Sequence, residues 1–405
     1  MNLTICEPRP FAEKSGSVGR PLLSNLNSRR PTQVWGGRLV AGAGSHGSSI
    51  LQGLASGPIT DDFSILAAVS RRRLDGYIDN SYNGASFAQE DVSYGSFAVK
   101  FLGGNRLSAD LKLFGSSADH RPDPGVILEP FQREYVQVVR DRDTGQPLNV
   151  PGLFPGQNFA NPRQGLAIAN PGTRDPDRMV VDTNPLEDAE TWGLTLTADY
   201  RADDFTIRYI GGYSSYDYRF QIDADYSAAR DSGLDWSRLY LGSQPVSNYT
   251  GYGLTPSDMR YGIDQDVSYF SHELQYLSAG DGPVQFIAGL FYYASEEEQR
   301  VAYREFNDEL MATYAFFGSL RGGPVSEDNV LYRGDAGLRT SAFATFGQLE
   351  WSPSARTTIT AGLRYSLDDK EGRDNTFAQY VGDPDDPVVY RDIEDSWDQT
   401  TWRLG

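Results

Sequence analysis

The chain has 405 residues, a formal net charge of -19 and a mean hydropathy of -0.48, so it is long enough for two soluble domains or one barrel. It contains no run of about 18 apolar residues, which excludes a helical membrane protein but not a barrel with polar lumen and loops. The acidity argues against nucleic acid as a partner, because phosphate binding depends on basic surface. The single cysteine, Cys6, excludes internal disulfides and cysteine-rich metal sites.

Segments with alternating apolar and polar residues follow one another along the chain and predict β-strands. A period of two is the strand period, because successive side chains point to opposite faces. Most segments exceed the globular strand of about five or six residues. They match tilted strands that cross a hydrocarbon layer, which need about 9–11 residues. The predicted strands are residues 33–44, 48–56, 63–76, 89–102, 106–118, 189–200, 204–221, 263–278, 284–300, 338–351, 356–371 and 396–405.

After the second segment, the connections alternate between short and long. The short connections are 57–62, 103–105, 201–203, 280–283 and 352–355. The long connections are 77–88, 119–188, 222–262, 301–337 and 372–395. If the strands run up and down, all tight turns lie at one end of the sheet and all long loops at the other. This asymmetry is typical of an antiparallel up-and-down outer-membrane β-barrel, with short periplasmic turns and long extracellular loops.

The same alternation predicts which side chains of a barrel face its lumen. The predicted lumen residues are Thr195, Thr197, Asp199, Thr206, Arg208, Thr358, Thr360 and Arg364. Among them Arg208, Arg364 and Asp199 are candidate ligand contacts. Three aromatic residues of the long loops, Tyr135, Phe159 and Tyr249, are candidates for stacking on a ligand. His272 falls on the lipid-facing side, and the alternation alone does not explain it.

Motifs for other kinds of site are weak. Residues 42–47 (GAGSHG) match the dinucleotide-binding glycine pattern, but no further β-α-β units follow. Asp383, Asp385 and Asp386 could form an oxygen cage for calcium, although the adjacent prolines favour a stiff, solvated loop. With three histidines and one cysteine, a catalytic zinc or iron site is not expected. We therefore expect neither an enzyme nor a cofactor.

Two neighbouring predicted strands carry a more specific pattern. Residues 341–351 read SAFATFGQLEW, and residues 358–371 read TITAGLRYSLDDKE after a short turn. This pair resembles the barrel hairpin of TonB-dependent receptors. Residues 270–276 with 286–292 resemble another hairpin of that family, and residues 25–32 (NLNSRRPT) resemble its last plug segment. The resemblance covers residues 24–405.

The resemblance implies a barrel of about 22 strands with a plug domain in its lumen, in the outer membrane of a Gram-negative bacterium. Residues 1–32 would then be a remnant of the plug domain and its linker. Residues 33–405 would be the N-terminal half of the barrel. The implied function is uptake of a scarce solute, most commonly a ferric siderophore, energised by the TonB-ExbB-ExbD complex. The implied partners are that complex, outer-membrane lipid and the solute.

The ends of the chain favour a fragment. Residues 1–30 lack the apolar stretch of a secretory signal peptide, and the last predicted strand stops at Gly405. Two alternative functions stay open. A passive porin-like channel would lack the plug and would have about 16–18 strands. A soluble all-β carbohydrate-binding protein would not be found in the outer membrane.

Overall fold

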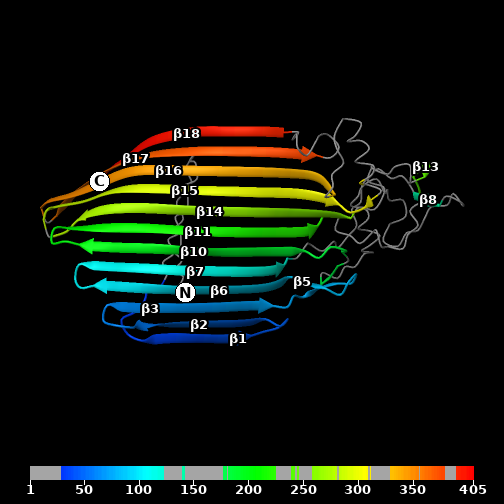
Figure 1. The fold of residues 1–405 in the computed structure, drawn as a ribbon, viewed down its shortest axis with the longest axis horizontal. Coiled ribbons are helices and arrows are strands. Elements are labelled where there is room, and N and C mark those ends of the chain that lie inside the picture. The colour runs from blue at the N-terminus through cyan, green and yellow to red at the C-terminus, as the bar shows by residue number, and fades with distance from the viewer. Residues whose placement is uncertain are drawn as a thin grey trace.

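A computed structural model describes residues 29–122, 139–141, 177–179, 181–224, 239–241, 244–245, 258–280, 282–308, 311, 329–354, 356–378 and 389–405. Its main feature is one antiparallel sheet of twelve strands (Figure 1). The strands, in their order across the sheet, are β1 (Gly36–Ala43), β2 (Ser49–Pro58), β3 (Phe63–Leu74), β6 (Gln89–Gly103), β7 (Leu107–Arg121), β10 (Leu186–Arg201), β11 (Phe205–Asp223), β14 (Met259–Ser278), β15 (Val284–Glu305), β16 (Val330–Ser354), β17 (Thr357–Ala378) and β18 (Val389–Leu404).

This sheet confirms the predicted fold class. Every predicted strand is present, and each pairs with the next one along the chain, as an up-and-down barrel requires. Within the described residues, the outermost strands β1 and β18 do not pair with each other, so the sheet is a partial barrel. No helix of the described residues is long and apolar enough to cross a membrane.

Several strands are longer than predicted, and they are longer at the end that carries the long connections. β14 begins at Met259 instead of residue 263, and β15 ends at Glu305 instead of residue 300. β16 runs for 25 residues and begins at Val330 instead of residue 338. The long connections are therefore shorter than the sequence suggested, and the barrel wall is taller.

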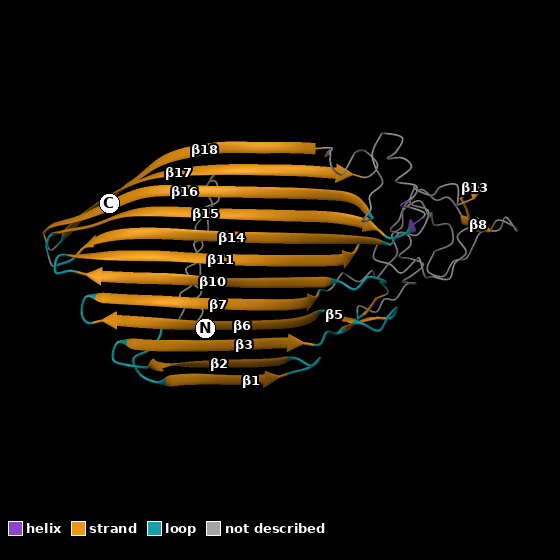
Figure 2. Ribbon diagram, in the orientation of Figure 1, coloured by secondary structure: helices purple, strands orange, loops and turns teal. Residues whose placement is uncertain are grey.

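The two ends of the sheet differ as predicted. Figure 2 shows the tight turns together on the left and, on the right, the strand ends from which the long connections leave the sheet. The long connections carry two small sheets of their own. One contains β4 (Ile78–Asn80), β5 (Ser86–Phe87) and β9 (Arg178–Met179). The other contains β8 (Val139–Asp141), β12 (Leu239–Leu241) and β13 (Gln244–Pro245).

The first of these small sheets has a hydrophobic core. Ile78, Phe87, Met179 and Val181 are buried against one another. The side-chain amide of Asn80 donates a hydrogen bond of 2.8 Å to the backbone carbonyl of Val181. The connection between β3 and β6 therefore packs against the chain that leads into β10.

The register of the strands assigns each side chain to one of two faces. One continuous row across the sheet joins Ala109, Ala198, Tyr209, Leu274, Leu290, Thr345 and Tyr365. This face exposes large apolar side chains, including Leu290, which is 49% exposed. An apolar band of this kind is the lipid-facing surface of a membrane barrel. We call this side the outer face and the opposite side the lumen face.

The outer face contains one polar pair within its apolar band. His272 lies on this face, as the alternation predicted, and its Nδ1 is 2.6 Å from the hydroxyl of Tyr209 on the next strand. Polar groups in hydrocarbon are costly unless they find a partner in the protein. The pairing of the two side chains therefore accounts for a histidine at this position.

A boundary row divides each of the central strands into two halves. It runs through Gly193, Ser214, Tyr269, Ser295 and Thr340 on the lumen face. We call the part of the sheet between this row and the tight turns the turn half. The part between this row and the long connections is the loop half.

Candidate ligand-binding wall

The lumen face of the turn half carries a charged cluster. Asp199 on β10 lies opposite Arg208 on β11, and Arg208 Nε donates a hydrogen bond of 2.7 Å to Asp199 Oδ1. Arg201 Nη2 lies 3.6 Å from the same carboxylate. Asp199 is only 8% exposed. The structure thus brings together two of the three charged lumen residues that the sequence singled out, and each neutralises the other.

The segment before β1 approaches this part of the lumen face. The backbone amide of Thr32 donates to Ser56 Oγ at 2.9 Å, and Gln33 Nε2 donates to Ser64 Oγ at 2.9 Å. Arg30 lies 3.8 Å from the carboxylate of Asp110 on β7. The chain therefore enters the sheet from the lumen side.

Arg364 lies on the lumen face of β17, in the same row across the sheet as Asp199 and Arg208. Its guanidinium is above the rings of Phe291 and Phe346, at 5.7 and 5.9 Å from their centroids. Its Nε donates a hydrogen bond of 2.9 Å to Ser366 Oγ. The side chain is exposed on the lumen face, so a solute in the lumen could reach it.

The lumen face of the loop half is aromatic. Neighbouring ring centroids are 6.0 Å apart for Tyr216 and Tyr218, and 6.4 Å apart for Tyr218 and Phe220. The series then crosses three further strands, with separations of 6.3, 4.8 and 6.2 Å. We call these six side chains the aromatic ladder: Tyr216, Tyr218, Phe220, Tyr261, Tyr303 and Tyr332. The separations fall in the range of favourable offset and edge-to-face ring contacts.

The ladder is open to a solute at its far end. Tyr303 and Tyr332 lie opposite each other on β15 and β16, and each is 37% exposed. Exposed rings on a lumen wall can bury the flat apolar surface of a ligand. The ladder is therefore the best-formed candidate for a binding surface among the described residues.

Two carboxylates accompany the ladder on the lumen face. The Tyr218 hydroxyl donates a hydrogen bond of 3.2 Å to Glu187 Oε1. Gln265 Nε2 donates one of 2.7 Å to Glu297 Oε1. The register places all arginines in the loop half of β10, β11, β14, β15 and β16 on the outer face: Arg219, Arg260, Arg300, Arg304, Arg333 and Arg339.

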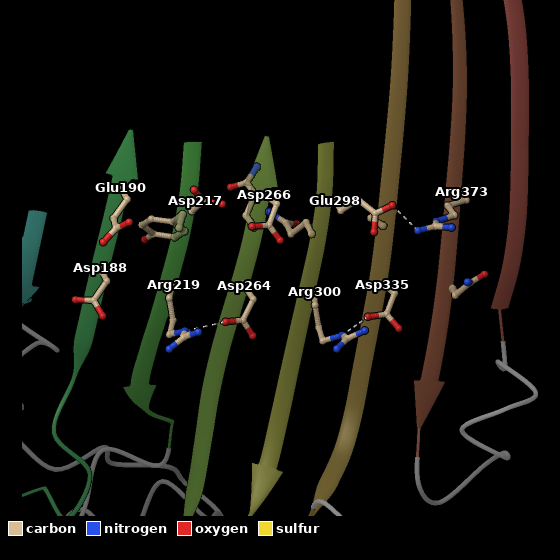
Figure 3. A pocket seen from close by; sticks show the side chains of 15 residues that line it. Asp188, Glu190, Asp217, Arg219, Asp264, Asp266, Glu298, Arg300, Asp335 and Arg373 are labelled. Atoms are coloured by element: carbon tan, nitrogen blue, oxygen red, sulfur yellow. Dashed lines mark hydrogen bonds and ion pairs between the residues drawn. The ribbon is translucent and has the colours of Figure 1, made fainter. Parts of the chain in front are cut away.

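The outer face of the loop half is correspondingly charged. One row across the sheet contains Asp188, Arg219, Asp264, Arg300 and Asp335 (Figure 3). Arg219 Nε is 3.3 Å from Asp264 Oδ1, and Arg300 Nε is 2.6 Å from Asp335 Oδ1. These side chains line a hollow of about 790 Å³. Because they share the face of the apolar band, the hollow lies outside the barrel and is not a candidate for a solute in the lumen.

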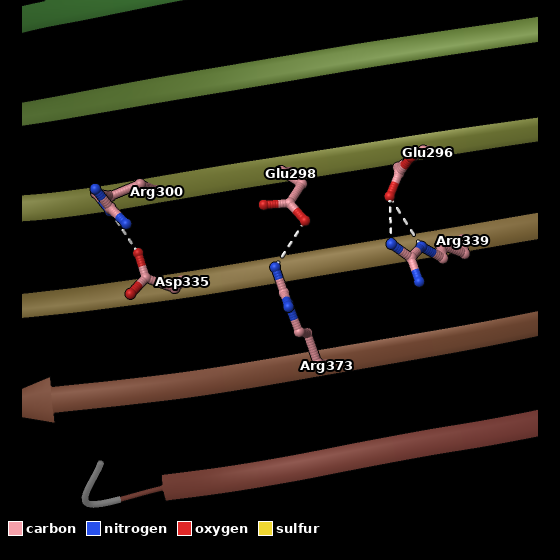
Figure 4. Close-up of polar contacts among 6 residues, drawn as sticks. All are labelled: Glu296, Glu298, Arg300, Asp335, Arg339 and Arg373. Carbon is pink, nitrogen blue, oxygen red and sulfur yellow. Dashed lines mark hydrogen bonds and ion pairs between the residues drawn. The ribbon is translucent and has the colours of Figure 1, made fainter. Parts of the chain in front are cut away.

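Further ion pairs continue this charged outer surface across β15, β16 and β17. Figure 4 shows that Glu298 on β15 reaches Arg373 on β17, at 2.7 Å, across the strand between them. Glu296 on β15 pairs with Arg339 on β16 at 2.6 Å. The charges begin on the outer face where the apolar band ends, near the boundary row.

Three acidic residues lie near one another at the loop end of the sheet: Asp182, Asp223 and Asp258. Burial and the nearby carboxylates of Asp223 and Asp258 raise the pKa of Asp182 to about 7. The hydroxyl of Thr183 donates a hydrogen bond of 3.3 Å to Asp182 Oδ1. In the described residues, no group of three or more potential ligands could hold a metal ion.

Some predicted site residues lie outside the described residues. They are the loop aromatics Tyr135, Phe159 and Tyr249 and the acidic residues Asp383, Asp385 and Asp386. The aromatic ladder was not predicted from the sequence. The available signal was the alternation of Tyr216, Tyr218 and Phe220 with Asp217 and Arg219, which continues the strand period with the apolar side chains on the lumen face.

Several solved receptor structures share the fold of this chain. The ferric yersiniabactin uptake receptor FyuA from Yersinia pestis matches with a TM-score of 0.59 and 14% identity, over 93% of this chain and 44% of the receptor. The ferric-catecholate import receptor Fiu from E. coli K12, in its open form, matches with a TM-score of 0.54 and 15% identity, over 93% and 52%. The siderophore receptor PiuA from Acinetobacter baumannii matches with a TM-score of 0.50 and 13% identity, over 93% and 47%.

These likenesses confirm, at the level of fold, the resemblance to TonB-dependent receptors seen in the sequence. The chain spans about half the length of the receptors it matches. No protein-family model matches the sequence, and no curated protein does.

Proposed function

We propose that this chain is part of an outer-membrane receptor of a Gram-negative bacterium that takes up a scarce solute. The solute class that we propose is the ferric siderophores, and the energy source is the TonB-ExbB-ExbD complex. In this proposal residues 1–32 are the end of a plug domain, and residues 33–405 are the N-terminal half of a barrel.

One observation carries the proposal. The same strands have an apolar outer face in the turn half and an aromatic lumen face in the loop half. The first arrangement suits a wall in lipid, and the second suits capture of a solute above the membrane. The fold shared with uptake and import receptors supports the same interpretation.

The side from which the chain enters the sheet supports the proposal that residues 1–32 are the end of a plug domain. Thr32 and Gln33 are hydrogen-bonded to serines on the lumen face of β2 and β3. A plug domain that precedes this segment would lie in the lumen. The plug would then receive the pull of the energy-transducing complex.

The test is energised uptake in iron-limited cells. Cells that produce the protein are supplied with radiolabelled ferric siderophores, with and without a protonophore or a deletion of TonB. We expect label to accumulate only when the inner membrane is energised and TonB is present. Fractionation should place the protein in the outer membrane, with heat-modifiable migration on a gel.

The alternatives give different results. A passive porin-like channel would admit the label regardless of the protonophore. A soluble carbohydrate-binding protein would fractionate with the periplasm or medium and would show no heat-modifiable migration. Either result would remove the proposed function.

A further inference from the structure

The aromatic ladder offers ring surface to the lumen. Six rings form one series on four strands, and the last two, Tyr303 and Tyr332, are exposed. Two aliphatic side chains extend this surface. Val267 and Leu338 lie on the lumen face in one row with Tyr216 and Glu297. A wall of this composition gains most from a ligand with flat apolar groups.

The charges around the ladder determine which net charge a bound ligand can carry. Glu187 lies directly opposite Phe220, and Glu297 lies opposite Val267, so both carboxylates belong to the same wall. The arginines of these strand segments are on the outer face, on the other side of the sheet. An aromatic face attracts cations and repels anions because its quadrupole is negative above the ring. An anionic ligand would therefore meet two carboxylates and several ring faces with no guanidinium on this wall to offset them.

Resting on the proposed uptake function, we infer that the solute bound by the ladder is a ring-bearing complex that is neutral or cationic. Its rings lie against the aromatic ladder, and any positive charge lies near Glu187 and Glu297. This class excludes highly anionic complexes such as a ferric tris-catecholate, in which three doubly charged catecholates surround one ferric ion.

Three small ferric complexes separate the effect of charge from the effect of rings. Ferric tris-catecholate is trianionic and has rings. Ferric tris-hydroxypyridinonate is neutral and has rings of similar size. Ferric tris-acetohydroxamate is neutral and has none. Binding of each radiolabelled complex to the full chain, extracted from outer membranes in detergent, is measured by equilibrium dialysis. We expect the neutral ring-bearing complex to bind at least about tenfold more tightly than the other two. A tenfold difference in affinity corresponds to about 1.4 kcal/mol of binding free energy.

Variants on opposite faces of one strand show where binding occurs. Tyr303→Leu removes an exposed ring of the ladder, and Tyr292→Leu removes a ring from the outer face of the same strand. The first change should weaken binding of the neutral ring-bearing complex about tenfold, because ring contacts are lost, and the second should leave it unchanged. Tyr332→Leu serves as a second ladder variant if Tyr303→Leu does not give a heat-modifiable barrel. Glu297→Gln should bring the affinity for the trianionic complex closer to the affinity for the neutral ring-bearing complex.

The inference fails if the trianionic or the ringless complex binds as tightly as the neutral ring-bearing one. It also fails if none of the complexes binds, or if Tyr292→Leu weakens binding as much as Tyr303→Leu does. These outcomes are distinct from failure of the proposed function. If energised uptake is absent but the binding preference is intact, only the transport proposal is refuted. If a trianionic complex is taken up with energy, only this inference is refuted.

Discussion

The turn half and the loop half of the sheet are built from the same strands but distribute polarity in opposite ways. In the turn half, Leu274 and Leu290 face outward, and Asp199 and Arg208 face the lumen. In the loop half, charged rows face outward and the aromatic ladder faces the lumen. The hydrogen-bonded backbone continues through the boundary without a change of register in β10, β11 and β14. The side chains alone therefore mark where, in the proposed receptor, the lipid would end and a solute-binding chamber would begin.

The largest effect should come from placing charge in the apolar band. Leu274→Arg puts a guanidinium on the outer face of the turn half, which costs about 2–4 kcal/mol near the middle of a bilayer. Ser268→Arg is the control, because it is on the same face of β14 just inside the loop half and should cost about 0–1 kcal/mol. The measurement is the yield of heat-modifiable protein in the outer membrane and its unfolding midpoint in urea. Equal losses in the two variants would contradict the boundary.

A smaller effect should follow from breaking the polar pair in that band. Tyr209→Phe removes the hydroxyl that contacts His272 Nδ1. Because hydrogen bonds within a membrane contribute about 1 kcal/mol, we expect a loss of that size in the free energy of unfolding. Tyr365→Phe, on the same face of the sheet, is the matched control. A loss no greater than that of the control would show that the pair does not stabilise the barrel.

Packing of the long connections should depend on pH. Burial raises the pKa of Asp182 to about 7, above its value of 3.8 in the unfolded chain, so the folded state binds the extra proton between these values. Stability of this region is therefore greatest at low pH and falls as pH rises from about 4 to about 7. Hydrogen exchange around residues 181–183, corrected for intrinsic rates, should show protection decreasing several-fold over that window.

Substitution of the acid tests the source of this effect. Asp182→Asn keeps the shape of the side chain but cannot ionise, so protection should become nearly independent of pH. If the wild type and this variant lose protection in parallel, another group is responsible.

The smallest effect should come from the outer surface of the loop half. Arg300→Gln removes the ion pair with Asp335, and both side chains are partly exposed to solvent. Exposed pairs of this kind contribute about 0–1 kcal/mol because water screens them. The unfolding midpoint should therefore change little, in contrast to Leu274→Arg. A loss of insertion in Arg300→Gln would mean that this surface does more than face an aqueous layer.

The sequence predicted the turn half well because its alternation is regular and one face is strictly apolar. It predicted the loop half less well. Residues 330–337 (VLYRGDAG) belong to β16, whereas the sequence predicts a loop there, since glycine and aspartate are depleted in strands. Their pairing with β15 and β17 outweighs that local preference.

The candidate site, too, could be predicted from the sequence only in part. Alternation was enough to place Asp199, Arg208 and Arg364 on the lumen face. It could not show that Asp199 and Arg208 neutralise each other, because that depends on the register of β10 with β11. The ladder joins residues from Tyr216 to Tyr332, which only the packing of four strands brings together.

The attachment of residues 32–33 to the wall has a mechanical consequence. Any tension along the chain ahead of β1 would reach the sheet first at the Arg30–Asp110 ion pair, and then at the hydroxyls of Ser56 and Ser64. Such contacts contribute about 1 kcal/mol each and can break one after another. The backbone bonds between β2 and β3, which must break together under shear, would hold. The leading segment can thus be peeled away while the sheet itself stays intact.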